Sequence, residues 1–397
     1  FYNAHFVHSH IAHFYALAGP DFVCGPAAPA SERNVLGVVG RVGLELGSAV
    51  VKARREAQHI QAILGGKPTH PLIGVPGGVS KGVTKEEQAT MIANAEDMLA
   101  FARTSMKVFK DVVLANKEYM DIVLNKDLYY HETYHMGLVN DKNQFEIHHG
   151  KVRVVDQKGN EHDKYEPFDY LDHIAEASLP WTFEKFPYLK NPGWKGLVDG
   201  PESGLYRASP LSRLNAADSM PTPEAQDALV EYRGILKDAG VEGPCQFTLC
   251  THWARIIEML CCAEKCLEDC QNPDILNGDI KQHDLVPGGR GVGCVEAPRG
   301  TLTHDYTCDE NGIVTACNLV VGTTNNNGPI CMDVAKAAKG LIHNYEISPG
   351  LLNMVEMAFR AYDPCNSCAT HALPGQMPIT AVIRNSDGSV YDTISRN

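Results

Sequence analysis

The stretch "DPCNSCATH" at residues 363–371 combines three features that are found in metal sites. Cys365 and Cys368 are separated by two residues, which is the spacing with which a loop chelates a metal ion. Pro364 stiffens the approach, and His371 follows the second cysteine by three residues. By itself, the motif also fits half of a zinc site or a redox-active cysteine pair. The rest of the chain is needed to choose between these kinds of site.

The composition is that of a globular protein. The chain has 397 residues, of which 44% are hydrophobic and 21% charged, enough for one large domain or two smaller ones. The net charge of −13 argues against nucleic acid as a partner. No apolar run reaches the roughly 18–20 residues of a membrane span. Thirteen cysteines without a secretory signal favour a reduced, cytoplasmic compartment over a disulfide framework.

Helical periodicity dominates the chain. Ser31 is the candidate N-cap of the first long helix, and Thr84 with Glu87 forms a capping box at the second. The expected helices span residues 31–64, 84–121, 222–238, 246–271 and 329–361. Turn signals predict β-hairpins within 145–165, 291–321 and 378–396, and irregular structure over 65–82 and 166–210. We therefore expect a mainly α fold with small β excursions and no clear domain break.

Two further stretches carry residue types that bind metals. In "HSHIAH" at residues 8–13, positions i and i+2 of a helix point about 200° apart, so only His10 and His13 can converge. Packed or interfacial histidines are the preferred interpretation. Zinc and iron–sulfur sites usually take thiolates from loops, whereas a helix supplies Cys261, Cys262, Cys266 and Cys270. We interpret these four cysteines as core residues that bind nothing.

"DPCNSCATH" resembles the C-terminal signature of nickel–iron hydrogenase large subunits. Four other stretches resemble segments of that family in the same order: "HSHIAHFYALAGPDFV" at 8–23, "GGKPTHPLIGVPGGV" at 65–79, "EAPRGTLTHDY" at 296–306 and "LVVGTT" at 319–324. The likeness spans nearly the whole chain and implies the large-subunit fold, with a long central helix bundle. The wording of the motif and the loop at 199–218 resemble the methanogen group that reduces methyl viologen but not coenzyme F420.

The resemblance implies a nickel–iron centre with carbon monoxide and cyanide ligands. Soft thiolates suit nickel and iron. Cys365 would be a terminal nickel ligand and a candidate base, and Cys368 would bridge nickel and iron. The other two thiolates belong to an upstream cysteine pair, and we expect an N-terminal piece that carries them to precede Phe1. Arg299, with Pro298 beside it, would lie over the open metal position and contact a cyanide.

Four further residues take roles from the same resemblance. Asp363 would pair with Arg299, and Thr323 would donate a hydrogen bond to the other cyanide. His371 would bind a buried Mg²⁺ or Fe²⁺ together with the backbone carbonyl of Leu319. The chain departs from the common pattern at Ser9, where many members have Asp, and at Gly322, where proline is frequent. Neither departure concerns a metal ligand.

The implied function is reversible cleavage of H2. The expected organisation is a single domain over residues 1–371, with residues 372–397 as a C-terminal extension that maturation removes. The buried site needs an electron relay in the form of an iron–sulfur small subunit, and further electron-transfer subunits such as heterodisulfide reductase or a ferredoxin-type acceptor. A coenzyme F420-reducing or NAD-reducing hydrogenase is the alternative within the family. The alternative from another functional class is a non-catalytic, complex-I-like homologue that binds no nickel.

Overall fold

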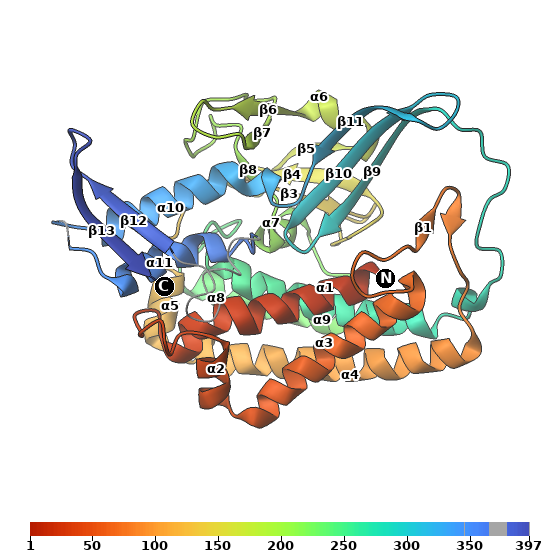
Figure 1. Ribbon diagram of the computed structural model, residues 1–397, viewed down its shortest axis with the longest axis horizontal. Helices are drawn as coiled ribbons and strands as arrows, with labels where there is room; N and C mark the ends of the chain where they lie inside the picture. Colours follow the sequence, from red (N-terminus) through yellow and green to blue (C-terminus); the bar gives the residue numbers. More distant parts are fainter. Residues whose placement is uncertain (345, 365–378, 397) are drawn as a thin grey trace.

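The body of the protein is a bundle of four long helices (Figure 1). The computed structural model describes residues 1–344, 346–364 and 379–396. Helix α9 packs against α4 and α1, and α3 packs against α1 and α4. The bounds of these helices are α1 Tyr2–His13, α3 Leu44–Gly65, α4 Lys85–Phe109 and α9 Cys250–Gln271. The expected mainly helical fold with a long central bundle is confirmed.

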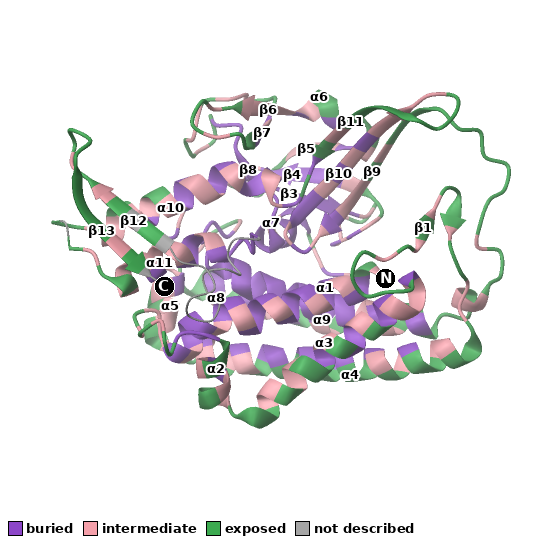
Figure 2. Cartoon of the chain, viewed as in Figure 1, coloured by how far each residue is buried: buried purple, intermediate pink, exposed green. Residues whose placement is uncertain are grey.

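Helix α9 lies at the centre of the bundle. Every residue from Cys250 to Ala263 is buried, so this part of the helix is enclosed on all sides; buried residues gather in the interior of the molecule (Figure 2). A helix without a polar face is typical of a core position rather than a surface position. Cys261, Cys262, Cys266 and Cys270 are all buried in this core.

Three predicted helices are shorter than expected because a local break divides each of them. Gly43, at φ 90°, separates α2 (Val35–Val42) from α3. The N-cap of α2 is Asn34 rather than the predicted Ser31, because the Asn34 side chain accepts from two backbone N–H groups. The capping box of Thr84 and Glu87 is present at α4. A π-turn and a short helix follow α4, namely η3 Lys110–Leu114 and α5 Lys117–Val123. The last predicted helix is divided into α10 Asn327–Leu341 and α11 Pro349–Arg360.

The β structure is more extensive than the sequence predicted. A four-stranded sheet has the order β5-β4-β3-β8, and only β3 and β8 in it are parallel. Its predicted hairpin is present as β4 Lys151–Val155 and β5 Glu161–Tyr165, and the additional strands are β3 Tyr134–Val139 and β8 Tyr206–Arg207. Residues 166–210 are not simply irregular, because β6 Ile174–Ser178 and β7 Lys185–Leu189 form a hairpin. The sequence analysis did not predict this hairpin, because the many Pro and aromatic residues of this stretch indicated irregular structure.

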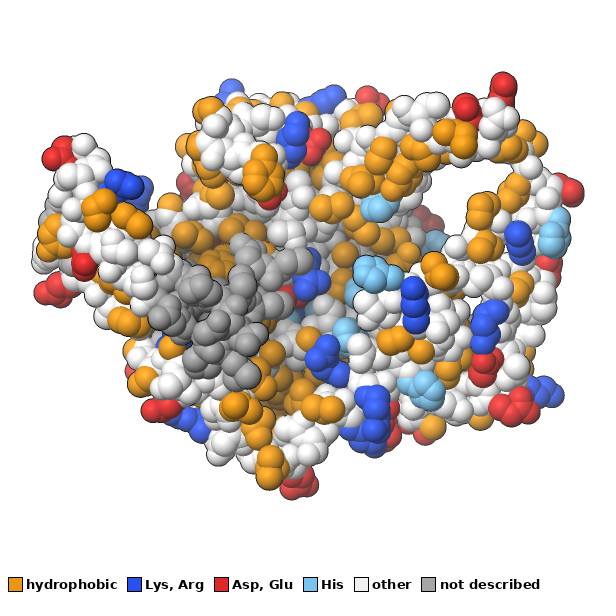
Figure 3. Space-filling view, in the orientation of Figure 1, with side chains coloured by type: hydrophobic (Ala, Val, Ile, Leu, Met, Phe, Trp, Pro, Cys, Tyr) orange, Lys and Arg blue, Asp and Glu red, His pale blue; other side chains and the backbone are white. Residues whose placement is uncertain are grey.

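A three-stranded antiparallel sheet, β11-β10-β9, stands beside the four-stranded sheet. Its strands are β9 Gly289–Ala297, β10 Gly300–Cys308 and β11 Val314–Val320. An extended segment leads into β9 and arches away from the helices, leaving an opening in the face shown in Figure 3. This segment bonds to the small hairpin of β1 Gly74–Val75 and β2 Gly78–Val79, since Val79 N donates to Ile280 O at 2.9 Å.

The tail forms the predicted hairpin, β12 Ile379–Arg384 with β13 Val390–Arg396, turning over "NSDG". The remaining elements are short apart from α8: η1 Phe14–Ala18, η2 Pro20–Cys24, η4 Pro167–Asp169, α6 Tyr170–His173, α7 Pro210–Ala216, α8 Pro223–Asp238, η5 Pro273–Leu276 and η6 Thr324–Asn326. Within the ranges that the structure describes, no helix combines the length and the apolar character needed to cross a membrane.

Candidate metal centre

The predicted ligands Cys365, Cys368 and His371 lie outside the described residues. Helix α11 ends at Arg360. The buried Asp363 and Pro364 follow it and stand directly before Cys365 in the sequence. Asp363 has φ 56°, a left-handed conformation that Asp tolerates better than most residues. Among the residues that the structure describes, no three His, Cys, Asp or Glu side chains come together in a way that could hold a metal ion.

Arg299 reaches Asp363 from the turn between β9 and β10. Its Nε donates to the backbone oxygen of Asp363 at 2.6 Å, and its Nη2 lies 3.4 Å from Oδ1 of the same residue. The expected contact between these two residues is therefore present. The carboxylate is buried, whereas the Arg299 side chain keeps 30% of its exposure. Burial raises the pKa of Asp363, and the positive charges of Arg299 and Arg255 oppose that rise.

The turn that carries Arg299 is fixed from two sides. Arg213 of α7 donates to the carbonyl oxygens of Ala297 at 2.9 Å and Pro298 at 3.2 Å. From the other side, Asn326 Nδ2 donates to the carbonyl oxygen of Arg299 at 3.2 Å. Gly300 is required at this place, because a Cβ would lie 2.3 Å from the oxygen of Gly322.

A buried charge network stands behind this turn. The Arg213 guanidinium makes two parallel bonds to Glu258, Nε–Oε1 at 2.6 Å and Nη2–Oε2 at 2.7 Å, and a third to Glu296 Oε2 at 3.1 Å. His10 Nε2 lies 3.0 Å from Glu258 Oε2. Burial pushes the pKa of Glu258 upward, but Arg213 and His10 outweigh it and the pKa is lowered. Burial also lowers the pKa of His10 to about 3, so this histidine is neutral.

The histidines of the "HSHIAH" stretch do not converge on one point. His10 contacts Glu258, whereas His13 Nε2 lies 2.8 Å from the carbonyl oxygen of Arg360 and the His13 ring stacks on His252. Because Arg360 ends α11, His13 helps to position the segment that leads to Asp363. A buried ion pair between Arg360 and Asp21, at 3.0 Å, holds the same helix end.

Three buried polar atoms near Asp363 have no hydrogen-bond partner in the described part of the chain: Nε and Nη2 of Arg255, and Oδ2 of Asp363 itself. Buried polar atoms are nearly always paired with protein, water or a bound group. A bound group that offers both acceptors and donors therefore fits between Arg255 and Asp363. The two thiols of Cys365 and Cys368 supply the soft donor type that nickel and iron take.

The other predicted site residues border the same turn. Pro298 is buried, and Thr323 is half-buried in the turn between β11 and η6. Leu319 lies in β11 opposite His304 and keeps 41% exposure. Strand β11 is an edge strand, so alternate carbonyl oxygens along it have no strand partner. Such a carbonyl oxygen is a donor type that Mg²⁺ accepts.

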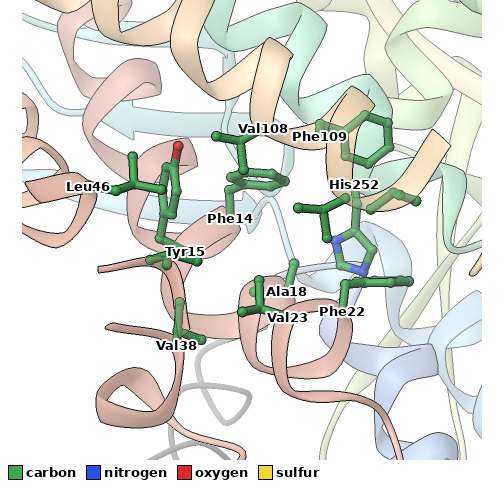
Figure 4. A pocket seen from close by; sticks show the side chains of 14 residues that line it. Phe14, Tyr15, Ala18, Phe22, Val23, Val38, Leu46, Val108, Phe109 and His252 are labelled. Atoms are coloured by element: carbon green, nitrogen blue, oxygen red, sulfur yellow. The ribbon is translucent and has the colours of Figure 1, made fainter. Parts of the chain in front are cut away.

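An apolar cavity extends from the bundle surface toward His252 (Figure 4). Phe14, Tyr15, Phe22 and Val38 lie around it with His252 at its inner end. The volume of the cavity is about 30 Å³. Because His252 stacks on His13 and His13 contacts Arg360, the inner end of the cavity lies close to the segment that leads to Asp363. A cavity with such a lining stays dry and admits small apolar molecules.

Sequence reasoning missed four buried charged residues: Arg213 and Glu258 of the charge network, the partly unpaired Arg255, and Arg360, which pairs with Asp21. One signal was available: "WARIIEML" at 253–260 places an Arg and a Glu inside an apolar helix. Charged residues are almost never fully buried unless they are paired or bound to a ligand. Both residues are buried to 0% exposure in α9.

Comparison with known proteins agrees with this architecture. The family model of nickel-dependent hydrogenases matches residues 121–371. The chain is 42% identical to the F420-non-reducing hydrogenase iron-sulfur subunit of Archaeoglobus profundus, over 99% of this chain and 80% of that protein. It is 35% identical to the NAD-reducing hydrogenase HoxS subunit beta of Cupriavidus necator, over 99% of this chain and 79% of that protein.

Solved structures agree as well. The chain superposes on an NAD⁺-reducing [NiFe]-hydrogenase in the H2-reduced state with a TM-score of 0.83 and 32% identity, covering 93% of this chain and 78% of that one. A Ni-Fe-Se hydrogenase from Desulfomicrobium baculatum shares the fold at a TM-score of 0.64 and 20% identity, covering 93% of this chain and 81% of that one. The chain belongs to the nickel-dependent hydrogenase family, and its fold is that of the large subunit.

Proposed function

We propose that this chain is the catalytic large subunit of a nickel–iron hydrogenase that cleaves and forms H2. The observation that carries the proposal is the contact of Arg299 with Asp363, two residues before Cys365. Cys365 and Cys368 would supply two thiolates to the metals. When bound, the nickel–iron pair supplies the two-electron chemistry that H2 cleavage requires.

The residues of this chain supply proton handling and charge. The thiolate sulfur of Cys365, or a carboxylate beside it, would be the base that takes the proton. Arg299 keeps a permanent positive charge beside Asp363, because a guanidinium does not lose its proton at working pH. Its contact with Asp363 fixes the plane of the guanidinium, and Arg213 fixes the turn on which it stands. Arg299 and Thr323 would hold the cyanide ligands of the iron through hydrogen bonds, beside the buried Pro298.

The apolar cavity supplies access for the gas. H2 carries no polarity, and it enters a dry apolar space more readily than a hydrated one. The cavity reaches His252, whose ring stacks on His13 at a centroid distance of 5.2 Å. We assign this cavity to storage and delivery of H2.

Electrons leave through an iron–sulfur small subunit, because a site enclosed within the protein needs a relay to a soluble acceptor. The acceptor beyond that subunit is of the F420-non-reducing type, such as heterodisulfide reductase or a ferredoxin, with methyl viologen as the artificial acceptor. The identity of 42% to an F420-non-reducing hydrogenase supports this choice over the NAD-reducing alternative at 35%. We also propose a cytoplasmic setting, a Mg²⁺ or Fe²⁺ held by His371 and Leu319, and a single catalytic domain over residues 1–371.

The proposal is tested on the full-length chain purified with its partner subunits. Nickel and iron per chain, infrared bands of carbon monoxide and cyanide, and H2-dependent reduction of methyl viologen are measured for wild type and Cys368→Ser. We expect about one nickel per wild-type chain and none in the variant. A wild-type complex without nickel would instead identify a non-catalytic homologue. Reduction of coenzyme F420 or NAD⁺ by the complete complex would replace the proposed acceptor and leave the hydrogenase activity standing.

A further inference from the structure

Cys245 and Cys250 are two buried thiols in hydrogen-bond contact at the start of α9. The Cys250 thiol donates to the Cys245 sulfur, and both side chains are free thiols. The backbone N–H of Cys250 donates to the carbonyl oxygen of Phe247 at 3.0 Å, which folds the chain back between the two cysteines. A disulfide holds its sulfur atoms about 2.05 Å apart. From hydrogen-bond contact, the two sulfurs have only a short distance to close.

The two thiols differ in how easily they lose their protons. Burial raises the pKa of Cys245, but hydrogen bonds from Cys250 and from the backbone N–H of Phe247 lower it. The positive charge of Arg207 acts in the same direction, and the net pKa of Cys245 is lowered. The hydrogen bond to Cys245 and burial raise the pKa of Cys250. Because the thiolate is the nucleophile, Cys245 is the reactive member of the pair and Cys250 carries the proton.

A surface cavity of about 740 Å³ reaches Cys245. Its wall includes the loop of residues 240–244 directly before Cys245, and Arg233 and Lys237 of α8 add positive charge to it. Cys245 keeps 2% exposure, whereas Cys250 is fully buried. A reagent as small as hydrogen peroxide can therefore reach the Cys245 sulfur from the cavity, and Cys250 is shielded behind it.

We propose that Cys245 and Cys250 are a redox modification site, which hydrogen peroxide converts into a disulfide. The Cys245 thiolate attacks one oxygen of the peroxide, the O–O bond breaks, hydroxide leaves, and Cys245 becomes a sulfenic acid. The Cys250 sulfur then attacks the Cys245 sulfur, and the S–O bond breaks. The hydroxyl group leaves as water with the proton of Cys250. Two thiols are thereby oxidised to one disulfide, and one hydrogen peroxide is reduced to two waters.

The turn between the two cysteines connects this site to the proposed metal centre. Gln246 and Thr248 lie in that turn, and Arg207 donates to the Gln246 backbone oxygen at 3.1 Å and to Thr248 Oγ1 at 3.2 Å. Arg207 Nε also donates to Tyr362 Oη at 2.9 Å, and Tyr362 directly precedes Asp363. A disulfide would draw the turn together and move the acceptors of Arg207. This effect on H2 turnover rests on the proposed function, whereas disulfide formation does not.

The test exposes the full-length chain with its partner subunits to a small excess of hydrogen peroxide. Alkylation followed by peptide mass spectrometry measures the state of each cysteine. We expect the peptide that carries Cys245 and Cys250 to lose two hydrogen atoms and to resist alkylation until a dithiol reductant is added. Both thiols remaining open to alkylation, while other cysteines of the chain are oxidised, would overturn the inference.

Cys294 is the matched internal control. It is more exposed than Cys245, but burial raises its pKa to about 12. Because the reaction rate follows the thiolate fraction, Cys245 should react more than about tenfold faster than Cys294. Equal rates for Cys245 and Cys294 would show that Cys245 is not an activated thiol and would contradict the proposed order of the two steps.

Two variants separate the steps of the reaction. Cys250→Ser keeps a hydroxyl that can donate to Cys245, so peroxide should stop at the sulfenic acid, which a cyclic 1,3-diketone traps. Cys245→Ser should leave Cys250 a free thiol under the same treatment. Oxidation of Cys250 at the wild-type rate in that variant would overturn the inference. If either variant does not accumulate, the wild-type peptide measurement decides.

The effect on turnover has its own readout. Peroxide can also damage a metal centre directly, so the informative quantity is the part of H2 turnover that a dithiol reductant restores. We expect such recovery in wild type and none in Cys245→Ser. A reversible disulfide with no recoverable turnover would refute the connection through Arg207 and leave the modification site standing. A wild-type complex without nickel would overturn the proposed function, and the disulfide would still be measured in that complex.

Discussion

Arg213 and Glu258 form a fully buried, two-point ion pair, with Nε–Oε1 at 2.6 Å and Nη2–Oε2 at 2.7 Å. The same guanidinium donates to the carbonyl oxygens of Ala297 and Pro298, directly before Arg299. The pair therefore ties the central helix to the turn that carries Arg299. A network of this kind is satisfied only when every member is present.

Replacing Glu258 with Gln should destabilise the protein by about 3–5 kcal/mol, because the charge of Arg213 loses its main partner inside the core. Urea unfolding of the nickel-free chain measures the effect. Glu264→Gln, on the same helix, is the control, since Glu264 accepts from the backbone N–H groups at the start of α8 and should cost only about 1 kcal/mol. An equal fall in the free energy of unfolding in both variants would mean that the buried Arg213–Glu258 pair stabilises the protein no more than the Glu264 cap does.

Arg299→Lys should lower H2 turnover roughly a hundredfold while nickel stays bound, because Lys keeps the charge and loses the planar fork that contacts Asp363. Methyl viologen reduction and nickel analysis on the same sample check this. Arg290→Lys, on the exposed part of β9, is the control and should keep wild-type turnover. Unchanged turnover in the Arg299 variant would leave this arginine with a structural role only.

His135 should make the protein sensitive to mild acid. Burial lowers the pKa of His135 to about 3, below its ordinary value of 6.5. Between these two pH values His135 is protonated in the unfolded chain and neutral in the folded chain. The free energy of unfolding should then be unaffected by His135 above pH 6.5 and fall by up to about 1.4 kcal/mol per pH unit below it. His135→Gln should flatten the measured slope between pH 6 and 4 by that amount. An identical slope would show that His135 is protonated in the fold.

Val38→Phe should narrow the apolar cavity, because Val38 is buried and its side chain lies at the cavity wall (Figure 4). We expect a several-fold fall in the rate at which H2 or carbon monoxide reaches the centre, with unchanged infrared bands in the resting enzyme. Gas-binding kinetics give the rate. Val51→Phe, on the exposed face of α3 at 69% exposure, is the matched control. Equal rates in both variants would exclude this cavity as the route.

The tail should be absent from active enzyme. Residues 372–397, which include the hairpin of β12 and β13, follow His371, around which the proposed metal pocket would have to close. We expect the H2-active protein to end at His371 and chains that retain residues 372–397 to lack nickel. Intact-mass spectrometry of the active, purified large subunit decides. A nickel-loaded chain that includes the tail would contradict cleavage and leave the hydrogenase assignment untouched.

The sequence by itself determined the family and the positions of the motifs. The cysteine spacing at 365 and 368, the "APRG" turn and the capping box at Thr84 are local patterns, and local patterns can be read directly because the chemistry lies within a few residues. The tail hairpin was predicted for the same reason. Helix ends were predicted less well: Asn34 and Ser31 are both good cap residues, and the structure shows that Asn34 accepts from two backbone N–H groups at the start of α2.

Only the tertiary structure decided which charges meet. His10 and Glu258 are 248 residues apart in sequence, and Arg213 and Glu258 are 45 apart, so no local pattern couples them. The histidines of α1 were interpreted as packed residues, but only the fold shows their partners, a carboxylate for His10 and a backbone carbonyl oxygen for His13. The unpaired Nε and Nη2 of Arg255 are likewise visible only in the fold, because a donor is unpaired only with respect to everything packed around it.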